Sequence, residues 1–199
     1  MTKIKYIPKY DLSKLSKSRK IRPNLAWYTV IVTWFYVGFI PLMPGTFGSL
    51  ACYPLYYFIL RNSSSFTSSI VIMWASFAVL LVAGYFSIRS YQDNNGSHDH
   101  KTVVIDEVLG MMMALCLCFP QCYKLSQKLY KYIDLKPSYL CFLIIFIIFR
   151  YFDIRKPLFI GHIDKYITNA FGVILDDLLA GVYTALIVIA SYEVIGKFI

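Results

Sequence analysis

The chain has 199 residues, of which 58% are hydrophobic and 18% aromatic. Only 16% are charged, against about 25% in soluble domains. This composition excludes an ordinary soluble domain and predicts one small all-α bundle of membrane helices. The five cysteines lie in or beside apolar runs and form no C-x-x-C pair, which favours packing over a metal or disulfide role; they are Cys52, Cys116, Cys118, Cys122 and Cys141.

The net charge of +9 is concentrated at the N-terminus, where residues 1–22 carry eight Lys or Arg and one acid, Asp11. This stretch lacks the apolar region and the small-residue cleavage site of a signal peptide. We expect a cytoplasmic tail that lies on anionic lipid. Nucleic acid is not an expected partner, because residues 23–199 form a single membrane-embedded domain with no soluble part.

Residues 25–43 are apolar, contain Trp27 and Trp34, and are barely long enough to span, since a crossing needs about 20 residues. The motif Pro44-Gly45-Thr46-Phe47-Gly48-Ser49 follows and opens the apolar run 50–60. A turn before a helix start leaves N–H groups that suit phosphate. The alternative, which spacing alone favours, is a simple helix start with Thr46 or Ser49 as N-cap.

Residues 66–88 are predicted to be a transmembrane helix, since they carry no charge. The polar loop 91–102 contains His98-Asp99-His100. A zinc site is not expected with so few histidines and no cysteine nearby, but Asp99 remains a candidate ligand for a hard cation.

Residues 103–119 form the next predicted helix, with Asp106 and Glu107 in its first turn. Acids in the first turn of a helix also complement the helix dipole, so a purely structural role is the alternative to a catalytic one. Gly110 leaves room on the same face. Residues 120–138 are predicted to be a basic, amphipathic connection on the membrane surface.

The apolar run 139–149 ends at Arg150, followed by Asp153. Eleven residues rise only about 17 Å, against a hydrocarbon core of about 30 Å. Arg150 and Asp153 are therefore expected inside the protein, on one face at i,i+3. The last helix is predicted to open at Asp176-Asp177, and Ala180-Gly181 should allow close approach of a neighbouring helix.

If the predicted helices cross the membrane one after another in alternating directions, all the polar motifs lie on the same side of it. Five acids there exceed three bases by two charges, a surplus that one divalent cation would neutralise. Oxygen ligands at a membrane face suit Mg²⁺. The acids are Asp106, Glu107, Asp153, Asp176 and Asp177, and the bases are Arg150, Arg155 and Lys156.

Over roughly residues 25–195 the chain resembles phosphatidylglycerophosphatase A, a bacterial membrane phosphatase. The resemblance rests on four motifs in order: Pro44-Gly45-Thr46 with Gly48-Ser49; His98-Asp99-His100 with Asp106-Glu107 and Gly110; Phe149-Arg150 with Asp153 and Lys156-Pro157; and Asp164, Gly172, Asp176-Asp177 and Ala180-Gly181. Two positions depart from the family pattern, Phe159 and Asn169-Ala170, so we expect the geometry of that loop to differ from the family's.

The resemblance implies Mg²⁺-dependent hydrolysis of phosphatidylglycerophosphate, a phospholipid substrate in the bilayer, to phosphatidylglycerol and phosphate. The expected metal ligands are Asp106, Glu107, Asp176 and Asp177, with Asp99 in addition; Asp153 joins the first four as a catalytic candidate. Candidate phosphate-binding residues are Arg150, Lys156, Thr46, Gly45 and Ser49. The identity of the general base stays open, as does a phospho-aspartyl intermediate.

Other classes fit less well. A CDP-alcohol phosphatidyltransferase needs D-G-x-x-A-R, whereas Asp177 precedes Leu178-Leu179-Ala180-Gly181. A cysteine phosphatase needs C-x5-R, which is missing. A small divalent-cation transporter remains the alternative, and acids spread along several helices at mid-depth would favour it.

The basic tail predicts a cytoplasmic N-terminus. The substrate of the resembled family is made on the cytoplasmic leaflet of the bacterial inner membrane, so the site should face the cytoplasm too. A full crossing by residues 25–43 would separate the tail from the site. We therefore predict that this segment is re-entrant or interfacial.

Overall fold

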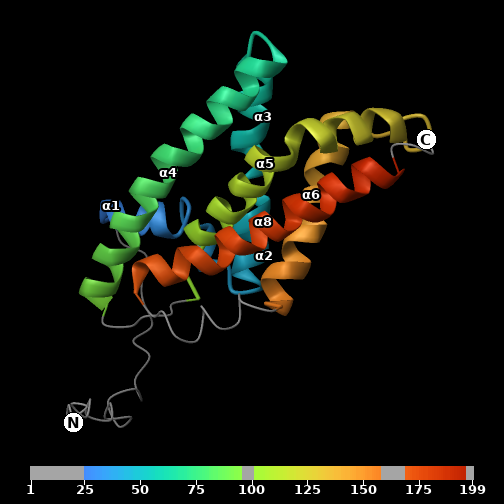
Figure 1. Cartoon of the computed structure of the whole chain (residues 1–199). Helices are drawn as coiled ribbons and strands as arrows, with labels where there is room; N and C mark the ends of the chain where they lie inside the picture. Colours follow the sequence, from blue (N-terminus) through green and yellow to red (C-terminus); the bar gives the residue numbers. More distant parts are fainter. Residues whose placement is uncertain (1–24, 96–100, 158–168, 196–199) are drawn as a thin grey trace, which may run out of the picture.

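A computed structural model describes residues 25–95, 101–157 and 169–195 of the chain (Figure 1). The described residues form helices and no strand, which confirms the predicted all-α class. The elements are α1 (Trp27–Val32), the 3-10 helix η2 (Val37–Phe39), α2 (Pro44–Leu50), α3 (Tyr53–Asn62), α4 (Phe66–Asn95), α5 (Ile105–Leu129), α6 (Pro137–Arg155) and α8 (Ala170–Ile195).

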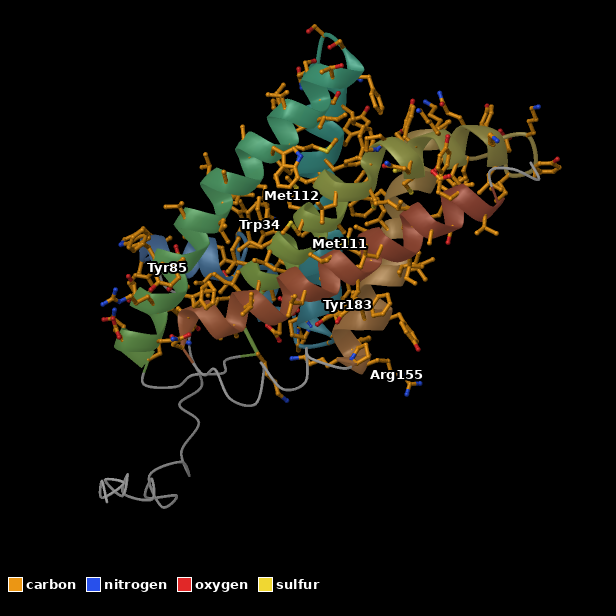
Figure 2. All side chains as sticks on the ribbon, viewed as in Figure 1. Trp34, Tyr85, Met111, Met112, Arg155 and Tyr183 are labelled. Carbon is orange, nitrogen blue, oxygen red and sulfur yellow. The ribbon has the colours of Figure 1, made fainter. Side chains whose placement is uncertain are left out.

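Four helices, α4, α5, α6 and α8, are long and apolar enough to cross a membrane. The chain is therefore a multi-pass membrane protein. α5 is the central helix, because 67% of its most apolar 18-residue stretch is buried inside the bundle, against 17% of the corresponding stretch of α4. Met111 and Met112 of α5 are fully buried in the interior of the bundle (Figure 2).

Among the described helices, α5 and α8 pack against each other most extensively, and two glycines allow the contact. A Cβ on Gly110 would lie 2.6 Å from the carbonyl oxygen of Asp177, and one on Gly181 would lie 2.5 Å from the carbonyl oxygen of Gly110. Both distances are too short for a real side chain. The prediction that small residues bring these helices together is confirmed, and the backbones touch beside Asp177.

The segment 25–43 contains no helix that could cross a membrane, as predicted. α1 has six residues and ends in a turn in which Trp34, Phe35 and Tyr36 all have positive φ. The carbonyl of Val32 then accepts a hydrogen bond from the amide of Val104, at 3.0 Å. The segment is therefore folded against the start of α5.

Two predicted helix ends were too early. α4 continues beyond residue 88 to Asn95, where the Asn94 and Asn95 side chains donate to carbonyls one turn earlier. α5 continues through Pro120 to Leu129 instead of ending at 119. Its extension is packed, since Cys122 is buried and its thiol lies 3.5 Å from the carbonyl of Cys141 on α6. Tertiary contacts therefore outweigh the helix-breaking effect of this proline.

Two predicted helix starts were also wrong. α8 begins at Ala170, about two turns before Asp177, because the Asn169 side chain accepts a hydrogen bond from the Gly172 amide at 2.9 Å and caps the helix. The motif that begins at Pro44 is itself the helix α2, and its N-cap is Met43. Neither Thr46 nor Ser49 is an N-cap, since both lie inside α2 and the N-cap of α3 is Cys52.

The polar ends of the helices gather at one end of the bundle. Figure 1 shows the first residues of α2, α5 and α8 and the last residues of α6 together at the lower end of the view. For the motifs that the structure describes, this confirms the predicted clustering at one end of the helices. The cysteines are buried and free, and burial raises the pKa of the Cys52 thiol, so they pack as small apolar residues.

Candidate active site

Three carboxylates form the centre of the polar end. Asp106 and Glu107 lie in the first turn of α5, and Asp177 lies about two turns into α8. One oxygen from each lies within 4.8 Å of the other two. Within the described ranges, none of the three takes part in an ion pair. Like charges this close need a proton or a cation between them.

Glu107 is held in a confined position. Its Oε2 is buried and has no hydrogen-bond partner among the described residues. A Cβ on Gly45 of α2 would lie 2.2 Å from Glu107 Oε1, so only glycine fits there without displacing the carboxylate. A buried acceptor without a donor is rare in native proteins, and it fits a carboxylate with a catalytic role or one that meets a cation or an ordered water.

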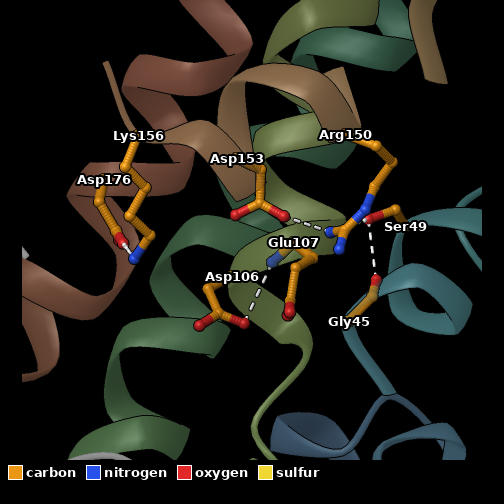
Figure 3. A network of polar contacts seen from close by, with 8 residues as sticks. All are labelled: Gly45, Ser49, Asp106, Glu107, Arg150, Asp153, Lys156 and Asp176. Carbon is orange, nitrogen blue, oxygen red and sulfur yellow. Dashed lines mark hydrogen bonds and ion pairs between the residues drawn. The ribbon is translucent and has the colours of Figure 1, made fainter. Parts of the chain in front are cut away.

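Arg150, near the C-terminus of α6, lies on the same side of Glu107 as Gly45 (Figure 3). Its Nη1 pairs with Asp153 and donates to Ser49 Oγ at 3.2 Å, and Ser49 Oγ donates in turn to the Gly45 carbonyl at 2.9 Å. Arg150 Nε is buried and has no acceptor in the described part of the chain. Asp153 and Ser49 therefore hold the guanidinium through Nη1, and the Nε–H remains available to donate to an anion.

Lys156 and Asp176 form a second ion pair, with Nζ 2.7 Å from Oδ2. Lys156 is the C-cap of α6 and has a φ of 41°, in the left-handed region where a side chain is unfavourable. The adjacent Asp176 and Asp177 therefore serve different partners: Asp176 contacts Lys156, whereas Asp177 joins the carboxylate cluster.

The structure brings most of the predicted site residues together. Asp106, Glu107 and Asp177 form the cluster, and Gly45, Ser49, Arg150 and Asp153 border it (Figure 3). Asp176 and Lys156 form a separate pair next to it. Thr46 is half-buried on α2. Asp99 lies outside the described residues, as do His98, His100 and Asp164.

The balance of acids and bases that the sequence predicted changes at Arg155. Arg155 is exposed at the end of α6 (Figure 2) and takes part in none of the ion pairs among the described residues, so it does not balance the acids. Asp153 and Asp176 are each neutralised by a base, and three carboxylates remain. All-oxygen donors of this kind are the ligands that Mg²⁺ prefers.

Two residues that support the site lie outside the motifs and were not predicted. Gly38 packs against the carbonyl of Thr102, just before α5, and Trp34 donates to the carbonyl of Ala51, just after α2. Neither lies at a spacing that marks a motif, and only their three-dimensional contacts identify them.

The fold and the site define a multi-pass membrane protein with a carboxylate and guanidinium centre at one end of its helices. The family model for phosphatidylglycerophosphatase A matches residues 30–192. The chain therefore belongs to the phosphatidylglycerophosphatase A family and is a phosphatase.

Two curated relatives carry the name of this family, and a third is named as a different lipid phosphatase. The phosphatidylglycerophosphatase A of Haemophilus influenzae is 30% identical over 81% of this chain and 86% of its own length. That of Escherichia coli is 28% identical over 86% of both chains. A putative phosphatidylinositol-3-phosphatase of Bacteroides thetaiotaomicron is 31% identical over 84% of this chain and 94% of its own. No solved structure matches the chain.

Proposed function

We propose that the chain removes the terminal phosphate of phosphatidylglycerophosphate with the help of Mg²⁺, producing phosphatidylglycerol and inorganic phosphate. The family match and the names of two relatives support the substrate. The observation that carries the proposal is the cluster of three carboxylates beside a buried guanidinium with an unused donor.

The residues fit a divalent cation. Asp106, Glu107 and Asp177 can offer three oxygens within 4.8 Å of one another, and Glu107 Oε2 is buried without a donor. A protein usually supplies Mg²⁺ with a few carboxylates and leaves the other positions to water and substrate phosphate. When bound, Mg²⁺ would place positive charge next to the phosphoryl oxygens.

The remaining roles fall to side chains of this chain. Arg150 Nε would donate to a phosphoryl oxygen, and Asp153 and Ser49 would hold the guanidinium in place for it. Lys156 would add positive charge from the end of α6. A carboxylate of the cluster would accept the proton of the attacking water.

The position of the site suits a lipid substrate. The polar centre lies at the end of the apolar helices, with exposed apolar side chains on the adjoining α2, such as Phe47 at 40%. A phosphate at the headgroup level can reach this centre while its acyl chains stay in the bilayer. We also propose that this end faces the cytoplasm in the bacterial inner membrane, as the basic tail indicates.

The test is phosphate release by purified protein in detergent, with Mg²⁺ or with EDTA. Phosphatidylglycerophosphate should be hydrolysed only with Mg²⁺, and water-soluble phosphomonoesters should be poor substrates. Phosphatidylinositol 3-phosphate belongs in the panel because of the name of the Bacteroides relative. A clear preference for that lipid, or for soluble phosphomonoesters, would refute the proposed substrate.

Orientation can be tested with single cysteines at Ser13 and Ser97 in a background without native cysteines. A membrane-impermeant reagent should label both from the same side of oriented vesicles. Labelling from opposite sides would contradict either the cytoplasmic site or the cytoplasmic tail.

A further inference from the structure

The turn after α1 has an unusual backbone. Trp34, Phe35 and Tyr36 have φ values of 45°, 55° and 70°. Left-handed conformation costs a residue with a side chain roughly 1–2 kcal/mol. Strain of this kind persists only where the surrounding structure imposes it, and it tends to occur near functional sites.

The turn directs the Trp34 side chain toward α2. Trp34 Nε1 donates a hydrogen bond of 2.9 Å to the carbonyl of Ala51, which is the C-cap of α2. Carbonyls at a helix C-terminus have no partner within their own helix. The indole therefore anchors the end of the helix that carries Gly45 and Ser49.

The residues on both sides of the turn hold the start of α5. Before the turn, the Val32 carbonyl oxygen accepts a hydrogen bond from the Val104 amide nitrogen, at 3.0 Å. After it, Gly38 packs so closely that a Cβ there would lie 2.0 Å from the carbonyl oxygen of Thr102. Val104 is the N-cap of α5, two residues before Asp106.

This segment therefore connects the two elements that meet at Glu107. One is α2, whose Gly45 limits the position of Glu107 Oε1, and the other is the first turn of α5, which carries Glu107 itself. Gly48 of α2 also packs directly on Val104, where an added Cβ would lie 2.8 Å from the Val104 side chain, so the segment reinforces a contact that α2 and the start of α5 already make. A shift of the segment would change the distance between Gly45 and the carboxylate.

We propose that Trp34 is a positioning residue: held by the left-handed turn, it fixes α2 relative to the first turn of α5 and thereby sets the geometry of the three-carboxylate cluster. The proposal rests on the proposed function for its kinetic readout. Loss of a partner outside the ligand shell typically costs about 10–100-fold in metal affinity or activity. We expect an effect at the lower end of this range, because Trp34 acts through backbone.

Trp34→Phe tests this proposal, because it keeps an aromatic ring and removes the Nε1 donor. Trp74→Phe is the matched control, since Trp74 lies on α4, 39% exposed, and packs edge-on against Phe77. For Trp34→Phe we expect the Mg²⁺ concentration at half-maximal activity to rise at least about fivefold and kcat to fall about tenfold. The control should match wild type in both. A partly unfolded sample would lose activity without a change in the half-activating concentration.

A second readout is independent of activity. Hydrogen exchange of peptides covering residues 101–108 should be faster in Trp34→Phe, because the Val104 amide bonds the same segment. Exchange in α6 should be unchanged. Normal exchange at 101–108 would overturn the proposal, as would a half-activating Mg²⁺ concentration equal to that of wild type. Faster exchange throughout the bundle would also overturn it, because that result indicates general destabilisation.

The two proposals can fail separately. If wild-type protein released no phosphate from phosphatidylglycerophosphate, the proposed substrate would be wrong, and exchange at residues 101–108 would still decide whether Trp34 holds the start of α5. If the wild type is active and Trp34→Phe is indistinguishable from it, the positioning role is wrong and the proposed function stands.

Discussion

Gly45→Ala should abolish most of the activity without weakening the fold. The added Cβ would lie 2.2 Å from Glu107 Oε1, while ordinary contact begins at 3.4 Å, so the carboxylate must move by more than an ångström. A misplacement of 1 Å at a catalytic centre can cost about 100-fold in rate, or roughly 2.7 kcal/mol of transition-state stabilisation. Alanine is the better helix former by about 1 kcal/mol, so α2 itself should be no less stable.

The assay is the initial rate of phosphate release at saturating Mg²⁺, together with the thermal unfolding temperature of the same sample. Gly84→Ala on α4 is the control, because its Cβ would lie 3.2 Å from the flexible ends of Ile105 and Leu109. That variant should keep kcat within about threefold of wild type, since flexible apolar ends can adjust. A Gly45→Ala enzyme with wild-type kcat would refute the close contact between α2 and Glu107 as a determinant of the site.

Further predictions concern charge and strain. Glu107→Gln and Asp177→Asn keep shape and remove charge, so each should lower kcat at least about 100-fold; wild-type rates in both would place the chemistry elsewhere. Arg150→Lys should not rescue activity, because a point charge cannot replace the guanidinium fork; normal kcat/KM would mean that Arg150 has only a structural role. EDTA should abolish turnover and Mg²⁺ restore it, whereas full turnover in stripped protein would contradict the metal requirement. Phe35→Gly should keep or raise the unfolding temperature, because it relieves left-handed strain of about 1–2 kcal/mol, whereas Phe58→Gly within α3 should destabilise by about 1 kcal/mol; equal destabilisation would contradict the strain at Phe35.

The sequence was most informative where chemistry and helix geometry coincide. Arg150 and Asp153 were expected inside the protein on one face, and they form an ion pair with side chains 15% and 12% exposed. Gly110 was expected to leave room on its face of the helix, and it contacts the backbone of Asp177. Both predictions follow from the spacing of residues on a helix and from the cost of charge in an apolar chain.

Helix ends were predicted less well, because they depend on contacts that spacing does not encode. The helix predicted to end at residue 119 continues through Pro120 to Leu129, where it packs on α6. The aspartate pair suggested the start of α8, but the Asn169 cap places it at Ala170. The sequence also could not predict that Asp176 pairs with Lys156 whereas Asp177 joins the carboxylate cluster. The packing of α6 and α5 against α8 decides which neighbour each carboxylate contacts.

The contact between Gly110 and Gly181 has a mechanical consequence. α5 and α8 touch through backbone atoms, which cannot adopt other rotamers and yield little to compression. This backbone contact therefore sets the distance between the carboxylates of Asp106 and Asp177. Changes in bilayer thickness or lateral pressure would be absorbed by the tilt of the lipid-facing α4, of which only 17% of the apolar window is buried. We therefore expect the geometry of the carboxylate cluster to depend little on the thickness of the surrounding bilayer.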